Sequence, residues 1–373
     1  MFRQALSTED DIVGVASAPP APPAHGRPAE RARSEVRPPS RPRGAHPAAV
    51  YRRRRAVALL VVLVVAGGIT VWNLETSPSG SPTRHSSSTK PRTGSTQPRR
   101  LSVAISWPSA GVSAVDINGT GAMAGPGGRR PVPIASVAKL MTAYVVLQDH
   151  PLTSGGAGPA IVVQPSEAAA YASEAGNGDS LVPVVAGERI TERQALEALL
   201  LPSADNMAWI LARWDAGSRA AFLERMNATA RRLGMTGTRY TDPSGLSPST
   251  TSTAVDEVRL GVAAMRQPAL KAIVARTTAV IPVAGVVRNY DSLLGKDGIV
   301  GLKTGTTAAA GGCVLLAAWH DLGRQPVLIV AASFGQRGTT RTMLAEALSA
   351  GDRLVLRVER ALDRHKRGGH LAA

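Results

Sequence analysis

The chain of 373 residues is long enough for one large domain or two modest ones. Its formal net charge of +16 suggests a polyanionic partner, but only 3% of the residues are aromatic and no basic patch carries interleaved aromatics, which argues against nucleic acid and favours anionic lipid or the cell wall. The single cysteine, Cys313, excludes an internal disulfide and a cysteine-based zinc site, and the histidines are scattered, so we expect neither a metal nor another cofactor.

Residues 1–55 are rich in Pro, Ala and Arg and poor in large apolar residues, which predicts a disordered basic leader. An uncharged apolar run, residues 56–72, follows a cluster of arginines and extends ~25 Å as a helix, enough to cross the hydrocarbon core of a membrane. We therefore predict a single membrane-spanning helix over residues 56–73. The arginines place the leader in the cytoplasm and the rest of the chain outside the cell. A cleaved signal peptide is the alternative, but a leader of this length without a following A-x-A site favours an uncleaved anchor in the cytoplasmic membrane.

Residues 74–100 are rich in Ser, Thr, Pro and Gly, which predicts a flexible linker before a folded domain over residues 101–365 and a disordered tail over residues 366–373. In the folded domain, apolar and β-branched runs predict strands at 101–107, 112–118, 278–283, 299–304, 313–320 and 326–334. Helical spacing of apolar residues predicts helices at 136–149, 191–214, 218–233 and 338–363. Strands at both ends around a helical middle predict an α+β fold, in which an antiparallel sheet packs on a helical subdomain.

Ser136 and Lys139 are the first pair of candidate catalytic residues. On the helix predicted over 136–149 they share one face, because residues three apart are neighbours on a helix. A serine hydroxyl is a weak nucleophile at neutral pH and needs an adjacent base. A lysine can be that base when burial or nearby positive charge lowers its pKa. The pair therefore predicts a serine nucleophile with a lysine base, although this short pattern alone is also typical of an ordinary surface helix.

Two further short motifs complete the set. Ser203 and Asp205 follow an apolar run, where a serine either caps a helix or supplies a second hydroxyl that relays protons between the base and the leaving group. The motif Lys303-Thr304-Gly305 ends a predicted strand. Its lysine attracts a carboxylate, its threonine hydrogen-bonds one, and its glycine lets the strand backbone approach a substrate closely. Each motif alone is weak, but their order on suitable elements of an extracytoplasmic domain predicts one active site.

These motifs and their surroundings resemble the penicillin-recognising serine D-alanyl-D-alanine carboxypeptidases of the bacterial cell wall, the low-molecular-weight penicillin-binding proteins. The resemblance covers residues 101–340 and includes the segments PIASVAKLMTAYVVL, GERITERQALEALLLPSADNMA, LGMTGTRYTDPSGLSPSTTSTAVDEVRLG and NYDSLLGKDGIVGLKTGTTAAAGGC. It implies a β-lactamase/transpeptidase-like fold. It also implies a membrane-tethered hydrolase that trims the terminal D-Ala from peptidoglycan stem peptides and is inhibited by β-lactam antibiotics.

The resemblance also implies a role for each motif residue. Ser136 is the acylated nucleophile, Lys139 its base and Ser203 the proton shuttle. The backbone N–H groups of Ser136 and Thr306 form the oxyanion hole. The substrate-binding residues that the resemblance implies are Asp205, Lys303, Thr304, Gly305 and Thr306.

Asp205 departs from the resemblance, because the family usually has asparagine at this position. An amide both donates and accepts hydrogen bonds, whereas an ionised carboxylate only accepts. We therefore expect Asp205 to repel the substrate carboxylate and to favour protonated Lys139. The adjacent Asn206 is turned by ~100° on a helix and is no simple substitute. One alternative is thus a catalytically impaired wall-binding or regulatory protein, and others are a D,D-transpeptidase or a β-lactamase, for which only Asp242 offers a nearby acid.

Overall fold

The computed structural model describes residues 103–153, 155–323 and 326–367. The leader and linker predicted from the sequence lie outside these ranges, as does the membrane-spanning helix predicted over residues 56–73. Among the helices of the described ranges, none combines the length and the apolar character that a membrane crossing requires. The predictions for the first hundred residues therefore stay predictions.

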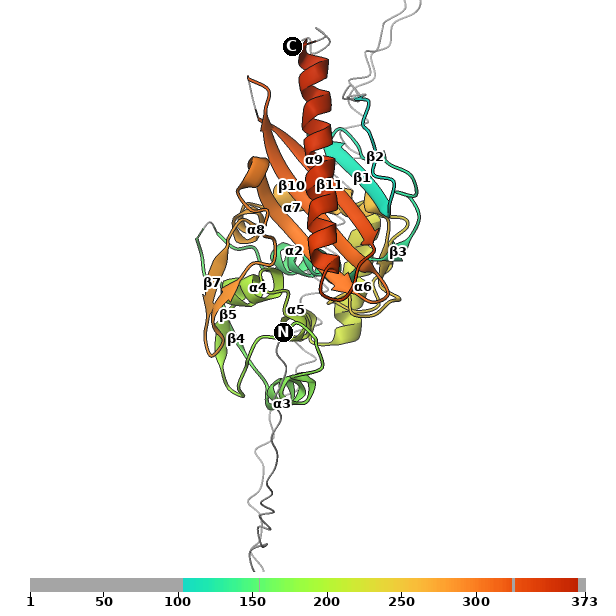
Figure 1. Ribbon diagram of the computed structural model, residues 1–373. Helices are drawn as coiled ribbons and strands as arrows, with labels where there is room; N and C mark the ends of the chain where they lie inside the picture. Colours follow the sequence, from blue (N-terminus) through green and yellow to red (C-terminus); the bar gives the residue numbers. More distant parts are fainter. Residues whose placement is uncertain (1–102, 154, 324–325, 368–373) are drawn as a thin grey trace, which may run out of the picture. The chain divides into compact units, whose positions relative to one another are not determined.

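An antiparallel sheet of five strands forms the centre of the described domain (Figure 1). In sheet order the strands are β2 (Met123–Ala124), β1 (Val112–Ile117), β11 (Pro326–Gln336), β10 (Gly311–Asp321) and β9 (Ile299–Thr307). The two ends of the domain meet in this sheet, since Val112 of β1 pairs with Phe334 of β11. The predicted α+β class with an antiparallel sheet is confirmed.

The strand predicted at 101–107 was wrong for the part that is described, because residues 103–108 belong to no strand. The apolar side chains of this segment instead pack on the core beneath the last helix, as Ile105 and Trp107 show. Their spacing therefore records burial against a neighbouring element and not pairing in a sheet.

The side chains of β10 explain why both faces of the sheet are covered. Val314 and Leu316 belong to the core shared with the last helix, whereas Cys313 and Leu315 belong to the larger core shared with the other helices. All four are fully buried. Because successive side chains of a strand point to opposite faces, a strand that is apolar throughout needs a cover on each side.

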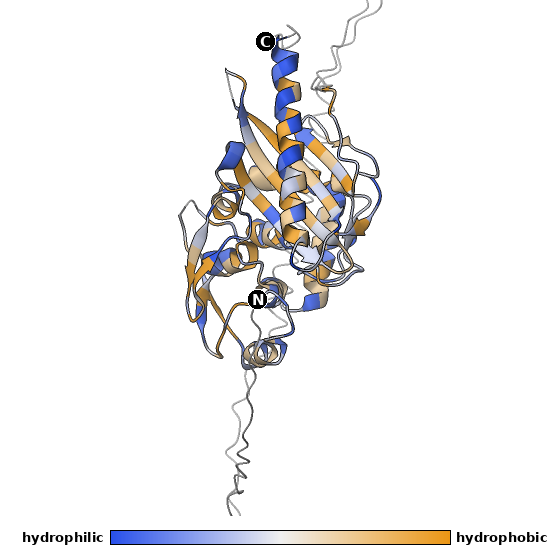
Figure 2. Ribbon diagram, viewed as in Figure 1, coloured by the Kyte–Doolittle hydropathy of each residue, from blue (hydrophilic) through white to orange (hydrophobic). Residues whose placement is uncertain are grey.

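The last helix, α9 (Met343–Arg367), covers one face of the sheet (Figure 1). In Figure 2, α9 alternates between hydrophilic and hydrophobic residues, whereas the strands beneath it are mainly hydrophobic. A Cβ atom on Gly351 would lie 2.7 Å from Cγ1 of Val314, so glycine allows the helix to approach the sheet closely. The helix begins later than the predicted residue 338 and continues past the predicted end at residue 363. Its buried residues recur once per turn, singly or as adjacent pairs, and are Met343, Ala347, Leu348, Ala350, Gly351, Leu354, Val355, Val358, Ala361 and Leu362.

Helices from the middle of the chain cover the opposite face and form the helical subdomain. They are η1 (Ala135–Ala138), α2 (Lys139–Asp149), α3 (Pro165–Glu174), α4 (Glu192–Leu200), α5 (Asp205–Ala216), α6 (Arg219–Arg232), α7 (Ala254–Met265) and α8 (Pro268–Val274). The short η2 (Lys296–Gly298) lies beside α9, where Lys296 Nζ contacts Asp352 at 2.7 Å. Short strand pairs border them within the described ranges: β3 (Val132–Pro133) with β6 (Thr251–Ser252), β4 (Ala160–Val162) with β5 (Arg189–Thr191), and β7 (Thr278–Ile281) with β8 (Gly285–Arg288).

The region predicted as helical over residues 191–214 divides into α4 and α5. Thr191 caps α4, its Oγ1 accepting a hydrogen bond from the backbone N–H of Gln194 at 3.2 Å. Pro202 cannot continue that helix, and Ser203 takes a left-handed conformation with φ of 63°. The chain therefore turns sharply between the two helices, and this turn presents the second predicted motif.

Glu257 of α7 gives the folded domain a dependence on pH. It is fully buried, and its Oε1 accepts a hydrogen bond from the Tyr240 hydroxyl at 3.2 Å. Burial raises the pKa of Glu257 from 4.5 to about 8. Between these two values the unfolded chain loses the proton and the folded chain keeps it. The stability that Glu257 contributes is therefore fully present below the unfolded pKa and is lost as the pH rises through the folded pKa.

We expect Glu257→Gln to remove this loss. Between about pH 5 and pH 8, the free energy of unfolding of the wild type should fall relative to that of the variant by roughly 3–5 kcal/mol. Urea unfolding of both full-length proteins across this range measures the difference. Glu346→Gln, on the exposed start of α9, is the matched control and should follow the wild type. Parallel stability curves for the wild type and Glu257→Gln would contradict the expectation.

Candidate active site

Ser136 and Lys139 meet at the junction between η1 and α2. Ser136 lies in the single turn of η1, and Lys139 is the first residue of α2. The Lys139 Nζ donates a hydrogen bond to the Ser136 Oγ at 2.7 Å. The lysine side chain is fully buried, whereas Ser136 is half-buried and reaches a pocket. The spacing of three residues thus brings a hydroxyl and an amine into direct contact, as the sequence predicts.

Two further oxygen atoms surround the Lys139 nitrogen. Asp205 Oδ1 lies 2.6 Å from it, and the backbone carbonyl oxygen of Ser244 lies 3.0 Å from it. Burial lowers the pKa of Lys139, and the neighbouring Asp205 carboxylate opposes that shift. Burial also raises the pKa of Asp205, against the effect of Lys139. The two groups are therefore closer in proton affinity than a lysine and an aspartate in water.

The Ser244 carbonyl is positioned by a loop that Asp242 organises. The Asp242 carboxylate accepts hydrogen bonds from the Ser244 hydroxyl at 2.7 Å and from the backbone N–H groups of Gly245 and Leu246 at 2.8 Å and 3.0 Å. This carboxylate is buried and committed to its own loop. Asp242, the acid that the sequence offers for a β-lactamase, thus has a structural task in this fold.

Lys303 approaches the same centre from β9. Its Nζ donates hydrogen bonds to Ser203 Oγ and to the Thr304 carbonyl oxygen, both at 2.9 Å. Burial holds the pKa of Lys303 well below its ordinary value, and the nearby Lys139 charge lowers it further. The Ser203 hydroxyl, predicted as a partner of Lys139, therefore accepts its hydrogen bond from Lys303 in this structure.

Asn206 faces away from this centre. Its side-chain amide exchanges two hydrogen bonds with the backbone of Val182, at 3.2 Å and 2.8 Å. The neighbouring Asp205 has its backbone N–H bonded to the Ser180 carbonyl at 2.7 Å and its side chain turned to Lys139. Asn206 therefore fixes the segment around residue 182, and Asp205 is the residue that occupies the position of the expected amide.

Gly305 allows β9 to pack against the start of the nucleophile helix. A Cβ atom at this position would lie 2.7 Å from the backbone nitrogen of Ser136 and 3.0 Å from that of Val137. Real Cβ atoms do not approach backbone atoms so closely. The flanking Thr304 is buried and Thr306 is exposed. Only glycine lets the strand and the serine stand this close together.

A pocket of about 110 Å³ opens over these groups. Its lining residues are Ser136, Ser180, Ser203, Tyr290, Thr304, Gly305, Thr306 and Leu344. Lys139 and Lys303 lie buried behind this lining. The structure thus brings all the predicted site residues together around one pocket. It adds Ser180, Tyr290 and Leu344, which were not predicted because single residues carry no motif. The one signal for Tyr290 was its aromatic side chain within the segment NYDSLLGKDGIVGLKTGTTAAAGGC.

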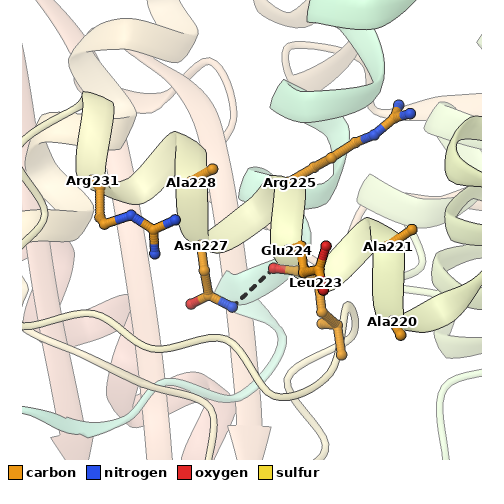
Figure 3. Close-up of a pocket in the computed structure, with 8 residues that line it drawn as sticks. All are labelled: Ala220, Ala221, Leu223, Glu224, Arg225, Asn227, Ala228 and Arg231. Carbon is orange, nitrogen blue, oxygen red and sulfur yellow. Dashed lines mark hydrogen bonds between the residues drawn. The ribbon is translucent and has the colours of Figure 1, made fainter.

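A larger hollow, of about 740 Å³, lies on α6 and shares no residue with this pocket (Figure 3). The described residues that line it all come from this single helix. Figure 3 shows the side chains of Arg225 and Arg231 well apart along the helix, and Asn227 bonded to the backbone of its own helix at Leu223. Because no reactive groups converge there, its size does not make it the candidate site. Within the described ranges, no group of three or more His, Cys, Asp or Glu residues is placed to hold a metal ion.

Comparisons with known proteins agree with this geometry. The sequence pattern of the D-alanyl-D-alanine carboxypeptidase family matches residues 113–333. A D-alanyl-D-alanine endopeptidase of Pseudomonas aeruginosa is 36% identical over 215 residues, which are 55% of this chain and 65% of the relative. A D-alanyl-D-alanine carboxypeptidase of Mycobacterium tuberculosis is 35% identical over 185 residues, which are 48% of this chain and 59% of the relative. The chain therefore spans less than two thirds of the length of these relatives.

Solved structures show the same fold. A Streptomyces DD-transpeptidase has a TM-score of 0.59 at 22% identity, and the match covers 68% of this chain and 98% of that one. Penicillin binding protein 5 from Haemophilus influenzae has a TM-score of 0.58 at 19% identity, over 68% of this chain and 72% of that one. At these identities the likeness concerns the arrangement of sheet and helices.

Proposed function

Because the chain belongs to the D-alanyl-D-alanine carboxypeptidase family, matched over residues 113–333, we propose that it is a serine D,D-carboxypeptidase that removes the terminal D-Ala from peptidoglycan stem peptides. One observation carries the proposal. The Ser136 hydroxyl lies at the pocket in contact with the buried Lys139 amine, 2.7 Å away, and a second buried lysine, Lys303, approaches from the strand opposite. A nucleophile, a base and a cation for a carboxylate are the groups that this reaction needs.

In the acylation step, the Ser136 oxygen attacks the carbonyl between the two D-Ala residues. Lys139 receives the serine proton, and its buried position favours that role. The backbone N–H groups of Ser136 and Thr306 stabilise the oxyanion, and the contact at Gly305 sets the distance between strand and nucleophile. This arrangement forms an ester between the enzyme and the shortened stem peptide.

The β9 motif recognises the carboxylate of the departing D-Ala. Lys303 supplies positive charge, and the hydroxyl groups of Thr304 and Thr306 supply hydrogen bonds at the pocket wall. Arrival of a carboxylate beside Lys303 favours its ammonium form and offsets the effect of burial. The Ser203 hydroxyl, which accepts a hydrogen bond from Lys303 in the structure, relays the proton taken up by Lys139 to the leaving amine. Water then hydrolyses the ester and frees the enzyme.

A covalent adduct tests the nucleophile. Mass spectrometry of the protein after incubation with benzylpenicillin should show one added penicilloyl group on Ser136, and Ser136→Ala should show none. Ser218→Ala, which alters an exposed helix cap, is the matched control and should be labelled like the wild type. An unlabelled wild type would contradict the proposal and favour the wall-binding or regulatory alternative, while rapid turnover of the adduct would favour a β-lactamase.

An endopeptidase that cleaves cross-linked stems is the second candidate, because relatives at 36% and 32% identity carry that name. The two activities differ in the size of the leaving group. Parallel assays with a stem pentapeptide and with a cross-linked stem dimer separate them. We expect release of D-Ala from the pentapeptide to be the faster reaction, and the opposite order would favour the endopeptidase.

A further inference from the structure

We propose that Asp205 is the terminal proton acceptor for Ser136, acting through Lys139, so that the serine is activated while Lys139 remains an ammonium ion. The inference rests on the proposed function, because it concerns the proton released when Ser136 is acylated. It assigns to this chain a two-residue base in place of a single lysine, and it gives a chemical task to the one residue that departs from the expected motif.

The contacts of the Lys139 nitrogen carry the argument. An ammonium has three N–H donors, and three oxygen atoms lie within hydrogen-bond distance: Ser136 Oγ at 2.7 Å, Asp205 Oδ1 at 2.6 Å and the Ser244 carbonyl at 3.0 Å. The ion pair with the Asp205 carboxylate favours the ammonium form, and an ammonium presents an N–H, and no lone pair, to the serine. To take the serine proton, Lys139 must give one of its own protons away.

Only one of the neighbouring oxygens can receive that proton. The Ser244 carbonyl accepts hydrogen bonds but does not become protonated under these conditions, and the Ser136 oxygen is the source of the proton. The Asp205 carboxylate is a true base at 2.6 Å, the shortest of the three contacts. Ser203, the other candidate relay, is bonded to Lys303. The described contacts thus leave a single path, from serine to lysine to aspartate.

The step balances in atoms and charge. An Nζ proton of Lys139 moves to Asp205 Oδ1, and the lone pair left on the nitrogen turns to Ser136 and takes the serine proton. The serine oxygen meanwhile forms its bond to the substrate carbonyl carbon, and the carbonyl electrons move to the oxyanion. The Lys139–Asp205 pair starts as an ammonium and a carboxylate with no net charge. It ends as an ammonium beside a carboxylic acid, and the net positive charge of this pair faces the new oxyanion. When the C–N bond breaks, Asp205 returns its proton to Lys139, and Lys139 passes a proton through the Ser203 hydroxyl to the leaving nitrogen.

The charges around the pair favour this exchange. Burial raises the pKa of Asp205 and lowers that of Lys139, which reduces the cost of moving a proton between them. The other charged groups that act on the pair are Lys303 from β9 and the carboxylates of Asp242 and Asp179 from the adjoining loops. Asp242 is engaged with its own loop and Asp179 is exposed, so neither replaces Asp205 at the nitrogen.

The pH dependence of acylation tests the inference. In the wild type, acylation by benzylpenicillin should rise with pH as Asp205 ionises. Asp205→Asn keeps the volume but must use neutral Lys139 as its base. We therefore expect the acylation rate of the variant to rise about one pH unit or more higher than that of the wild type. Near pH 6, its acylation rate should be lower than that of the wild type by about tenfold or more. The proposal would be overturned by an Asp205→Asn protein that is acylated faster than the wild type, or by one whose acylation rate rises over the same pH range as that of the wild type.

Asp179→Asn is the matched control, because it removes a carboxylate near the pair without removing a contact to Lys139. Its rising limb should stay close to that of the wild type. A shift as large as that of Asp205→Asn would show that charge alone, and not proton acceptance, explains the effect, and would overturn the proposal.

A measurement on the wild type keeps the test independent of variant folding. Acylation rates in mixtures of H₂O and D₂O count the protons in motion. We expect a curved dependence on deuterium content in the wild-type full-length protein, as two transferred protons require, and a linear one would overturn the proposal. A wild type that is never acylated would overturn the proposed function itself, whereas an acylated wild type with a linear dependence would overturn only the role of Asp205.

Discussion

Replacing Lys139 by methionine is expected to slow acylation of Ser136 by benzylpenicillin by about 10²–10⁴-fold, the range that a positioned base contributes. Methionine fills the buried space of the lysine stem but offers no proton transfer, so both the amine and the path to Asp205 are lost. Stopped-flow or quenched-flow acylation kinetics measure the rate, and the loss should persist at every pH.

The matched control is Lys271→Met, which removes an exposed lysine whose ammonium lies over the Trp319 ring. It should be acylated at the wild-type rate. Unfolding curves of both variants show whether the buried change also costs stability, since it leaves Asp205 without its cation. A Lys139→Met protein that is folded and acylates normally would show that Lys139 is not the base.

Substituting Gly305 by alanine is expected to lower the acylation rate by about 10²–10³-fold, as the loss of one oxyanion donor does. The new methyl group would lie 2.7 Å from the Ser136 nitrogen, so β9 and the nucleophile turn must separate. That separation moves the backbone N–H groups away from the position that the oxyanion occupies. The measurement is the same acylation assay, with melting temperature recorded in parallel.

The stability of Gly305→Ala decides how its acylation rate is interpreted. Overpacking of this kind costs about 1–3 kcal/mol of stability, which leaves a domain of this size folded. A folded Gly305→Ala protein with an unchanged acylation rate would contradict the close contact between β9 and Ser136. A protein that loses its melting transition would instead report on folding, and its acylation rate would not be used.

The parts of the fold with strong periodic patterns could be predicted from the sequence. The long apolar strands β9, β10 and β11 form where their composition places them, because a strand buried on both faces needs apolar residues throughout. The segment around Trp107 was assigned wrongly for the same reason, since burial against α9 produces the same apolar spacing as a strand. Local patterns record burial, but they do not say against which element a side chain is buried.

In the candidate site, the three motifs predicted which side chains meet but not how they bond. The turn after α4 depends on Pro202 and on the left-handed conformation of Ser203, and it directs the Ser203 hydroxyl to Lys303. The Ser244 carbonyl has no sequence signal at all, because every residue carries one. Asp205 was expected both to repel the substrate carboxylate and to favour protonated Lys139. The structure shows the contact with Lys139, which depends on the packing of α2 against α5.

The pairing of β1 with β11 affects how the protein folds during its synthesis. Val112 stands near the beginning of the described domain and Phe334 near its end, yet they are neighbours across one strand pair. Such a high contact order slows folding, because a long loop must close before its contacts form. The central sheet therefore remains incomplete on the ribosome until nearly the whole chain has been synthesised, and a prematurely terminated product exposes the unpaired edge of β1 to aggregation.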